Sequence, residues 1–168
     1  MKNFMGLFAA LLLLSCQQQK IGYVDNVKLM DGYQKKQDVE AEYQRRSEVF
    51  SRKRDSISQV FQLEAQELQN RTKTMSEQKA QEEFGLFQQK GQMVGQQLQQ
   101  EEQQMQRMGQ MKMDSVVQQV RKAVKEYGKA NGFTYILTGG EGGSVLYGDE
   151  KQDITEEVLK VLNEANPK

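Results

Sequence analysis

The sequence predicts an α+β protein in which a long antiparallel α-helical hairpin is inserted between the short strands of a small β-body. Residues 26–125 contain no Pro and are rich in Gln, Glu, Lys and Arg, which favour helix. Short runs rich in β-branched and aromatic residues lie before and after this segment. Only 37% of residues are apolar and the mean hydropathy is −0.79, which is low for a compact core. We therefore expect an elongated or oligomeric protein.

The first fifteen residues have the organisation of a bacterial lipoprotein signal peptide. Lys2 precedes an apolar run over residues 4–14, which as a helix would reach only about 16 Å, too short to span a bilayer core of about 30 Å. The run ends in Leu-Leu-Ser-Cys, which resembles a lipobox. We therefore predict a signal peptide over residues 1–15, lipidation of Cys16 and a lipidated tether over residues 16–19. An ordinary secretory signal with an incidental Cys is the alternative.

The mature chain begins with a short strand and continues into helix. Residues 20–25 are β-prone, and we place Ile21, Tyr23 and Val24 in the core of the β-body. Asp25 or Asn26 can cap the helix that follows. Residues 26–129 are then predicted to form the helical hairpin.

The hairpin is expected to turn within residues 72–78. Thr74 and Glu77 have the spacing of a capping box, in which a hydroxyl residue is followed three positions later by Glu. The second helix is then expected to pack back along the first through a coiled-coil seam. Heptad rows that support this interpretation are Tyr43, Phe50 and Ile57; Arg54, Phe61, Leu68 and Met75; and, on the second helix, Phe84, Phe87, Gly91, Val94, Leu98, Glu101, Met105 and Met108.

Residues 130–168 are expected to complete the β-body. Two β-rich runs flank the glycine-rich residues 139–143, which indicates a β-hairpin or a close pair of strands. We place these apolar side chains in the core of the body or between copies of it: Phe133, Tyr135, Ile136, Leu137, Val145, Leu146 and Tyr147. A short helix follows residues 153–156. So few strands bury only a marginal core, so several copies are expected to pool their sheets.

Composition argues against several functional classes. The chain has no His and one Cys, which excludes a Ser-His-Asp triad, His-ligated metal and a thiolate cluster. We expect no enzyme activity, catalytic residue, metal or cofactor. No Gly-x-x-x-x-Gly-Lys-Ser/Thr motif is present, so no nucleotide is expected. The 23 basic and 23 acidic residues balance, which gives no indication of nucleic-acid binding.

The second helix is rich in Met, whose flexible thioether adapts to partners of different shape. Met105 and Met108 are assigned to the seam, where they pack between the helices. Candidate contacts for a flexible partner are Met75, Phe84, Phe87, Met93, Met111 and Met113, with packing between the helices as the alternative.

The order of these features resembles the Skp/OmpH family of periplasmic chaperones. The resemblance covers the mature chain and is carried by Ile-Gly-Tyr-Val-Asp at residues 21–25, the long helical hairpin, and the motifs at residues 132–137, 145–147 and 153–159. It implies a jellyfish-like homotrimer with a shared β-barrel and three tentacles. It also implies an ATP-independent periplasmic holdase that binds unfolded outer-membrane β-barrel proteins between the tentacles and prevents their aggregation during transit.

Two features depart from the family pattern. Family members are often strongly basic, whereas this chain is neutral with a pI near 6.4, so long-range attraction of acidic partners is expected to be weaker. The predicted lipid at Cys16 would also anchor the protein to a membrane, which we take to be the outer membrane, facing the periplasm. The alternative function is a structural coiled-coil envelope lipoprotein that tethers the membrane to the cell wall. Such a spacer has no need of the β-rich C-terminal part.

Overall fold

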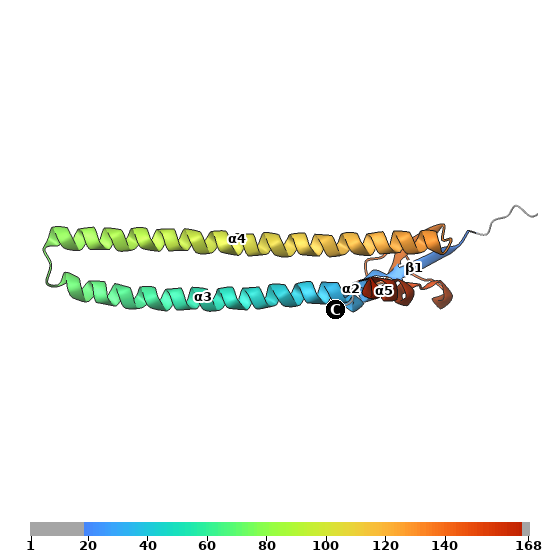
Figure 1. The fold of residues 1–168 in the computed structure, drawn as a ribbon, viewed down its shortest axis with the longest axis horizontal. Helices are drawn as coiled ribbons and strands as arrows, with labels where there is room; N and C mark the ends of the chain where they lie inside the picture. The colour runs from blue at the N-terminus through green and yellow to red at the C-terminus, as the bar shows by residue number, and fades with distance from the viewer. Residues whose placement is uncertain (1–18, 166–168) are drawn as a thin grey trace, which may run out of the picture. The chain divides into compact units, whose positions relative to one another are not determined.

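The computed structural model describes residues 19–165 and contains two units. The described residues up to Gln34 and from Gln118 onward form one unit, the body, and Lys35–Val117 form the other, the arm. The elements along the chain are β1 (Ile21–Asp25), α2 (Asn26–Gly32), α3 (Gln34–Thr72), α4 (Glu77–Ala130), β2 (Tyr135–Gly139), the 3-10 helix η2 (Glu150–Gln152) and α5 (Thr155–Glu164) (Figure 1). The predicted signal peptide and Cys16 lie outside the described residues.

The body contains a two-stranded parallel sheet. β1 pairs with β2 in a register that runs from Ile21 opposite Tyr135 to Asp25 opposite Gly139. Parallel strands cannot be joined by a tight turn, so a long connection must link them. Here that connection is the whole of α2, α3 and α4. Asp25 ends β1 and caps α2, because its carboxylate accepts hydrogen bonds from the amides of Val27 (3.0 Å) and Lys28 (3.1 Å).

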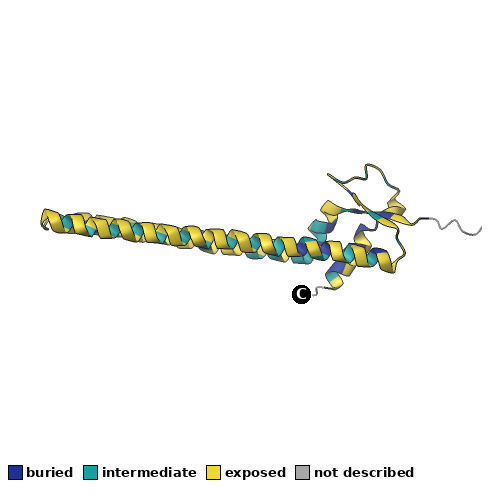
Figure 2. Cartoon of the chain, turned by 90° about the horizontal axis from the view of Figure 1, so that it is seen from above, coloured by how far each residue is buried: buried dark blue, intermediate teal, exposed yellow. Residues whose placement is uncertain are grey.

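A small apolar core joins α2, the end of α4 and α5 to one side of this sheet. Most of the buried positions in Figure 2 belong to the body. The Tyr33 hydroxyl donates to Gln119 Oε1 (3.0 Å), and Asp25 N donates to Thr155 Oγ1 (2.8 Å), which ties the end of β1 to the start of α5. The buried apolar residues of the body are Val24, Leu29, Tyr33, Val120, Ile154, Val158 and Leu162.

The predicted pairing of residues 133–137 with residues 144–147 does not form in the described chain. Residues 144–147 are not a strand, and Val145 N makes one hydrogen bond, to Thr138 O at 3.1 Å. Gly140 and Gly142 have positive φ angles, so the chain turns away after β2 without extending into a second strand. Leu146 is 100% exposed and Tyr147 is 90% exposed, because the single chain has no apolar layer to cover them.

The β-body residues predicted from sequence differ widely in burial. Only Val24 is fully buried. Tyr23, Phe133, Ile136 and Val145 are half-buried. The exposed members of the set are Ile21, Tyr135, Leu137, Leu146 and Tyr147.

In the arm, α3 and α4 lie side by side and are separated in sequence by residues 73–76. As residue numbers rise along α3, the numbers of the α4 residues they contact fall, from Glu42 with Lys112 to Arg71 with Glu83. Ser76 caps α4, since its hydroxyl accepts a hydrogen bond from Lys79 N at 3.4 Å. The capping box predicted for Thr74 and Glu77 is therefore wrong by two positions: Glu77 is the first residue of α4.

The seam between the two helices repeats every eleven residues. On α3, the inward positions Val39, Phe50, Phe61 and Thr72 follow this spacing, and on α4 so do Glu83, Val94, Met105 and Val116. An eleven-residue repeat corresponds to about 3.67 residues per turn, close to the roughly 3.6 residues per turn of a straight α-helix. The heptad prediction was wrong in period. Positions chosen at seven-residue intervals move gradually away from the inward face of a helix that repeats every eleven residues. This explains why several predicted seam residues are exposed: Tyr43, Arg54, Phe84 and Met108.

Two glycine substitutions are expected to change stability in opposite directions. A Cβ on Gly143 would lie 2.5 Å from the Thr138 carbonyl oxygen, so Gly143→Ala should lower the free energy of unfolding by about 1–3 kcal/mol. A Cβ on Gly95, inside α4, meets nothing within 4 Å, so Gly95→Ala should raise it by about 0.4–1 kcal/mol. Urea unfolding followed by circular dichroism measures both. A Gly143→Ala protein as stable as the parent would contradict the packing of this loop on β2.

Candidate binding grooves of the arm

Three ion pairs cross between the helices of the arm at intervals of eleven residues. On α3 the charged residues alternate in sign as Glu, Lys, Glu, and on α4 their partners alternate in the opposite sense. The pairs are Glu42 with Lys112, Lys53 with Glu101 (2.5 Å) and Glu64 with Lys90 (2.6 Å). Because all six side chains are partly solvated, each pair adds only modestly to stability and weakens in salt.

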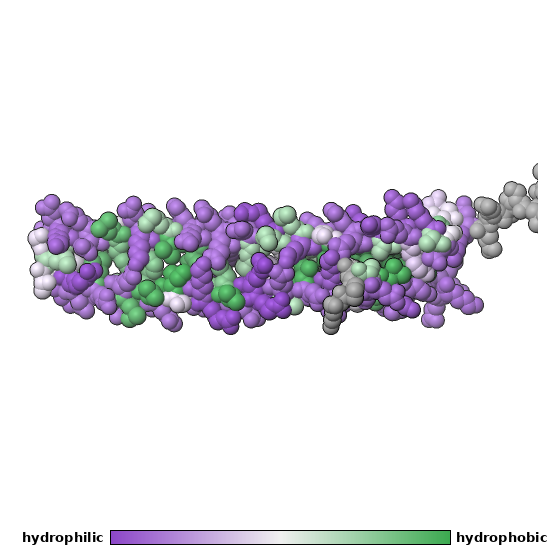
Figure 3. Space-filling model, in the orientation of Figure 1, coloured by the Kyte–Doolittle hydropathy of each residue, from purple (hydrophilic) through white to green (hydrophobic). Residues whose placement is uncertain are grey.

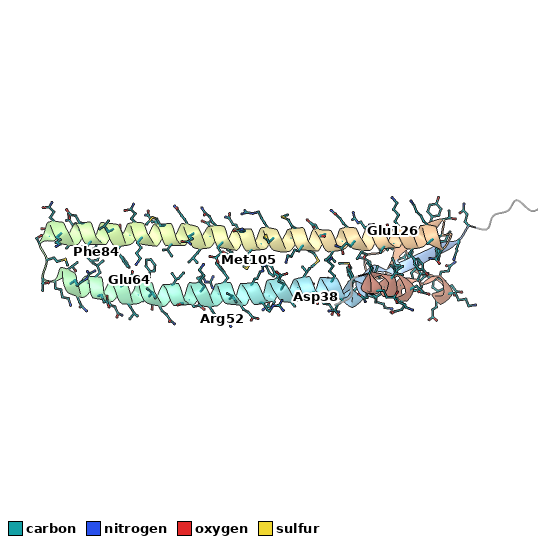
Figure 4. All side chains as sticks on the ribbon, viewed as in Figure 1. Asp38, Arg52, Glu64, Phe84, Met105 and Glu126 are labelled. Carbon is teal, nitrogen blue, oxygen red and sulfur yellow. The ribbon has the colours of Figure 1, made fainter. Side chains whose placement is uncertain are left out.

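Between the first two of these pairs lies a groove of about 540 Å³, here called the proximal groove. Its base is apolar: Phe50 is buried and Met105 is half-buried, and Figure 4 shows Met105 on the side of α4 that faces α3. Val49 (57% exposed) and Met108 (38% exposed) form an apolar rim. The polar residues around it are Glu42, Arg45, Arg46, Lys53, Glu101 and Gln104.

The distal groove, of about 220 Å³, lies between the second and third ion pairs. Lys53 lines both grooves, so the two lie on the same side of the arm. Ile57, Phe61 and Leu98 lie at its base, and the Phe61 ring packs against Phe87 with centroids 5.6 Å apart. Hydrophobic side chains are visible along the line between α3 and α4 in the space-filling view, with hydrophilic side chains outside them (Figure 3).

The other side of the arm has a groove of similar size but different chemistry. Gln106 lines it, whereas Gln104 lines the proximal groove, and residues two apart on a helix point about 200° from one another. This opposite groove is about 510 Å³. Tyr43 packs directly over Gly109, where a Cβ would lie 2.8 Å from the ring. The lining contains no Lys or Arg, and half of it is polar: Glu40, Gln44, Gln106 and Gln110, with Val39, Tyr43, Gly109 and Met113 as the other half.

Electrostatics single out Glu42 among the arm carboxylates. The Lys112 side-chain hydrogen bond is the largest influence and lowers the pKa of Glu42 below its ordinary value, partial burial opposes this, and the charges of Lys112 and Arg46 lower it further. Arg46 contacts the same carboxylate at 2.8 Å. In the body, burial raises the pKa of Tyr33, and burial together with neighbouring carboxylates raises that of Tyr23, so both phenols are neutral at pH 7.

The structure does not bring the six contact residues predicted from sequence into one site. Met93 and Met111 are exposed on α4, and Phe84 is exposed near the turn. Phe87 packs on Phe61, Met75 is half-buried beside the turn, and Met113 lines the opposite groove.

Sequence reasoning missed the rim of the grooves. Val49 and Val60 are exposed by 57% and 48% and line the proximal and distal grooves. Met108 was assigned to the seam but also lies on the rim. The eleven-residue separation of Val49 from Val60 could have identified them as equivalent positions on the groove rim. It is recognisable only after the eleven-residue repeat of the seam is known.

Comparison with known proteins identifies the family. The model of the OmpH-like outer membrane protein family matches residues 20–162. The chain belongs to this family. The fold also matches the crystal structure of a Caulobacter crescentus CB15 protein named as a candidate outer membrane chaperone of OmpH-like type. The TM-score is 0.76 with 14% sequence identity, over 88% of this chain and 86% of that one. No curated protein gives a significant sequence match.

One finding concerns whether the described residues could cross a membrane. Within residues 19–165, no helix combines the length and the apolar character needed to cross a bilayer.

The lowered pKa of Glu42 predicts that acid weakens the arm. A carboxyl whose folded pKa is depressed contributes stability above its unfolded value, near 4.5, and loses it as the pH falls through the folded pKa. Glu42→Gln should therefore reduce the urea midpoint at pH 7 but make the further loss between pH 5 and about pH 3 smaller than in the parent. Glu102→Gln is the matched control, since Glu102 is exposed and has no ion-pair partner among the described residues. Equal acid sensitivity in the parent and both variants would contradict this role.

Proposed function

We propose that this OmpH-like protein is an ATP-independent periplasmic holdase that binds unfolded outer-membrane β-barrel proteins and prevents their aggregation during transit. The observation that carries the proposal is the arm: two long paired helices whose interface leaves apolar grooves open to solvent on one side. Such grooves can hold apolar segments of an unfolded chain. A holdase needs no nucleotide, because binding by mass action lowers the concentration of free, aggregation-prone chain.

We infer further that three copies assemble through the body into a jellyfish-like trimer with a shared β-barrel. Ile21, Tyr135 and Leu137 fall on one face of the two-stranded sheet and are exposed by 39%, 57% and 41%. Leu146 and Tyr147 add further exposed apolar surface. Two strands alone are marginally stable and leave open edges, which other copies can cover. Residues 20–25 and 130–168 are the proposed trimerisation body.

In this assembly, residues 26–129 of each copy form an antiparallel coiled-coil tentacle with its tip at residues 72–78. The unfolded client is held in the cavity between the three tentacles. The grooves support a holdase over a structural tether between membrane and cell wall, because a spacer gains nothing from apolar surface left open along its length.

We also propose that residues 1–15 are removed as a signal peptide and that lipidated Cys16, with the tether at residues 16–19, anchors the protein to the outer membrane. A single acyl chain gives only reversible binding, whereas the several chains of a bacterial lipoprotein hold a protein stably. The short tether keeps the body close to the membrane that receives the client.

Anchoring has a direct test in bacterial cells that express the full chain. Radiolabelled palmitate should enter the wild-type protein and be absent from Cys16→Ser, and only the wild type should fractionate with membranes. A Ser15→Ala chain, which keeps a small residue before the cysteine, should still be labelled. Labelling of the Cys16→Ser protein would contradict the assignment.

Holdase activity is tested with the mature chain, residues 16–168 carrying Cys16→Ser. A urea-unfolded outer-membrane β-barrel protein is diluted into buffer with or without this protein, while light scattering is recorded and the mass of the complex is determined. We expect suppressed scattering and a complex of three chains with one client. A stable trimer that leaves aggregation unchanged would favour the structural tether, and a monomer would contradict the proposed assembly.

A further inference from the structure

We propose that the proximal groove is a bipartite subsite for client segments in which an acidic residue lies two positions from a large apolar residue. The apolar side chain enters the recess between Val49 and Met108, and the carboxylate pairs with Arg45. This inference rests on the proposed holdase function and says which surface of the arm recognises the client and which sequence pattern it selects.

Arg45 is the cation of the groove that is free to bind an external anion. Lys53 is held by Glu101 at 2.5 Å, and Arg46 is held by Glu42 at 2.8 Å. Arg45 is exposed and has no carboxylate partner among the described residues. The lining thus contains three cations and two carboxylates, and the excess positive charge belongs to Arg45. A guanidinium also binds a carboxylate through two parallel hydrogen bonds, which orients it.

The apolar half of the subsite lies one helical turn from that charge. Arg45 and Val49 are four residues apart on α3, so their Cβ atoms are about 5–6 Å apart. In an extended polypeptide, side chains two residues apart point to the same side and are separated by about 6.6 Å. An extended client can therefore place a carboxylate on Arg45 and an apolar side chain beside Val49 at once. The base of Phe50 and Met105 then contacts that side chain, and the thioethers adapt to its shape.

The other two grooves lack this combination. In the distal groove both cations are neutralised, Lys53 by Glu101 and Lys90 by Glu64 at 2.6 Å. The opposite groove has no cation in its lining, and its one carboxylate, Glu40, would repel an acidic segment. Among the described grooves, recognition of acidic and apolar groups together is confined to the proximal one.

The test compares two pairs of variants of the mature Cys16→Ser protein. Arg45→Gln removes the groove charge. Arg52→Gln removes the same charge from an exposed residue that lines none of the three grooves described above and lies on the side of α3 away from α4 (Figure 4). Val49→Ser removes rim surface, and Leu63→Ser removes a similarly exposed apolar residue (60%) that lines none of the three grooves. The probe is the same urea-unfolded barrel protein, with a fluorescent label to measure its Kd.

We expect Arg45→Gln and Val49→Ser each to weaken binding about three- to fivefold, while Arg52→Gln and Leu63→Ser change it less than about twofold. The effect of Arg45→Gln should vanish in 1 M salt, where charges are screened beyond about 3 Å, and that of Val49→Ser should persist. In a client variant whose Asp and Glu residues two positions from aromatic residues are changed to Asn and Gln, Arg45→Gln should have no effect.

Photo-crosslinking gives a second measurement that does not depend on affinity. A benzoylphenylalanine at Gln104, which lines the proximal groove, should capture the client, whereas the same group at the adjacent exposed Gln103 should capture little. Equal losses for Arg45→Gln and Arg52→Gln, or equal capture at the two positions, would overturn the subsite while leaving the holdase function intact. If the parent itself neither binds the client nor suppresses aggregation, the proposed function fails first.

Discussion

The pairing of α3 with α4 on an eleven-residue repeat is the constraint on which the rest of the arm depends. Two helices alone bury one narrow stripe each, and here the stripe includes Gly91 and the charged pairs as well as apolar residues. Apolar burial is therefore supplemented by cross-helix ion pairs at the same interval. The charged side chains of these pairs are long, and their ends reach solvent. They therefore border the interface between the helices without packing into it, and the grooves lie in the space that remains.

The body follows a related constraint, the parallel pairing of β1 with β2. A parallel pair needs a crossover of about a dozen residues or more, and the arm supplies it. The sheet remains two strands wide, with α2, α5 and the end of α4 covering only one side of it. What is left open is apolar: Tyr135 and Leu137 on the sheet, and Leu146 and Tyr147 in the following loop. The same sequence thus folds locally and leaves part of the apolar surface of its body uncovered in the described chain.

Sequence reasoning predicted the elements better than their contacts. The absence of Pro and the high helix propensity of residues 26–125 are local properties, as is capping of α2 by Asp25, and all could be inferred without knowing any partner. The period of the seam was mistaken, because apolar residues at steps of three and four fit seven-residue and eleven-residue repeats almost equally over short stretches. The strand expected at residues 144–147 failed for a different reason, since β-propensity is realised only where a neighbouring strand or apolar layer is present. Val49 and Val60 were missed because their role depends on which ion pairs border them.

A neutral net charge does not make this protein electrostatically featureless. The charges that border the grooves between the helices are largely paired, since Lys53, Lys90 and Lys112 each contact a carboxylate of the other helix. Long-range attraction is then weak, because paired charges cancel beyond a Debye length of about 8 Å. The guanidinium of Arg45, which has no carboxylate partner among the described residues and lies beside the apolar recess of the proximal groove, interacts only with a chain that is already in contact with the arm. Under the proposed holdase function, this arm would select client segments locally, after encounter and residue by residue. A strongly basic homologue would attract acidic chains from a distance, with less discrimination among their segments.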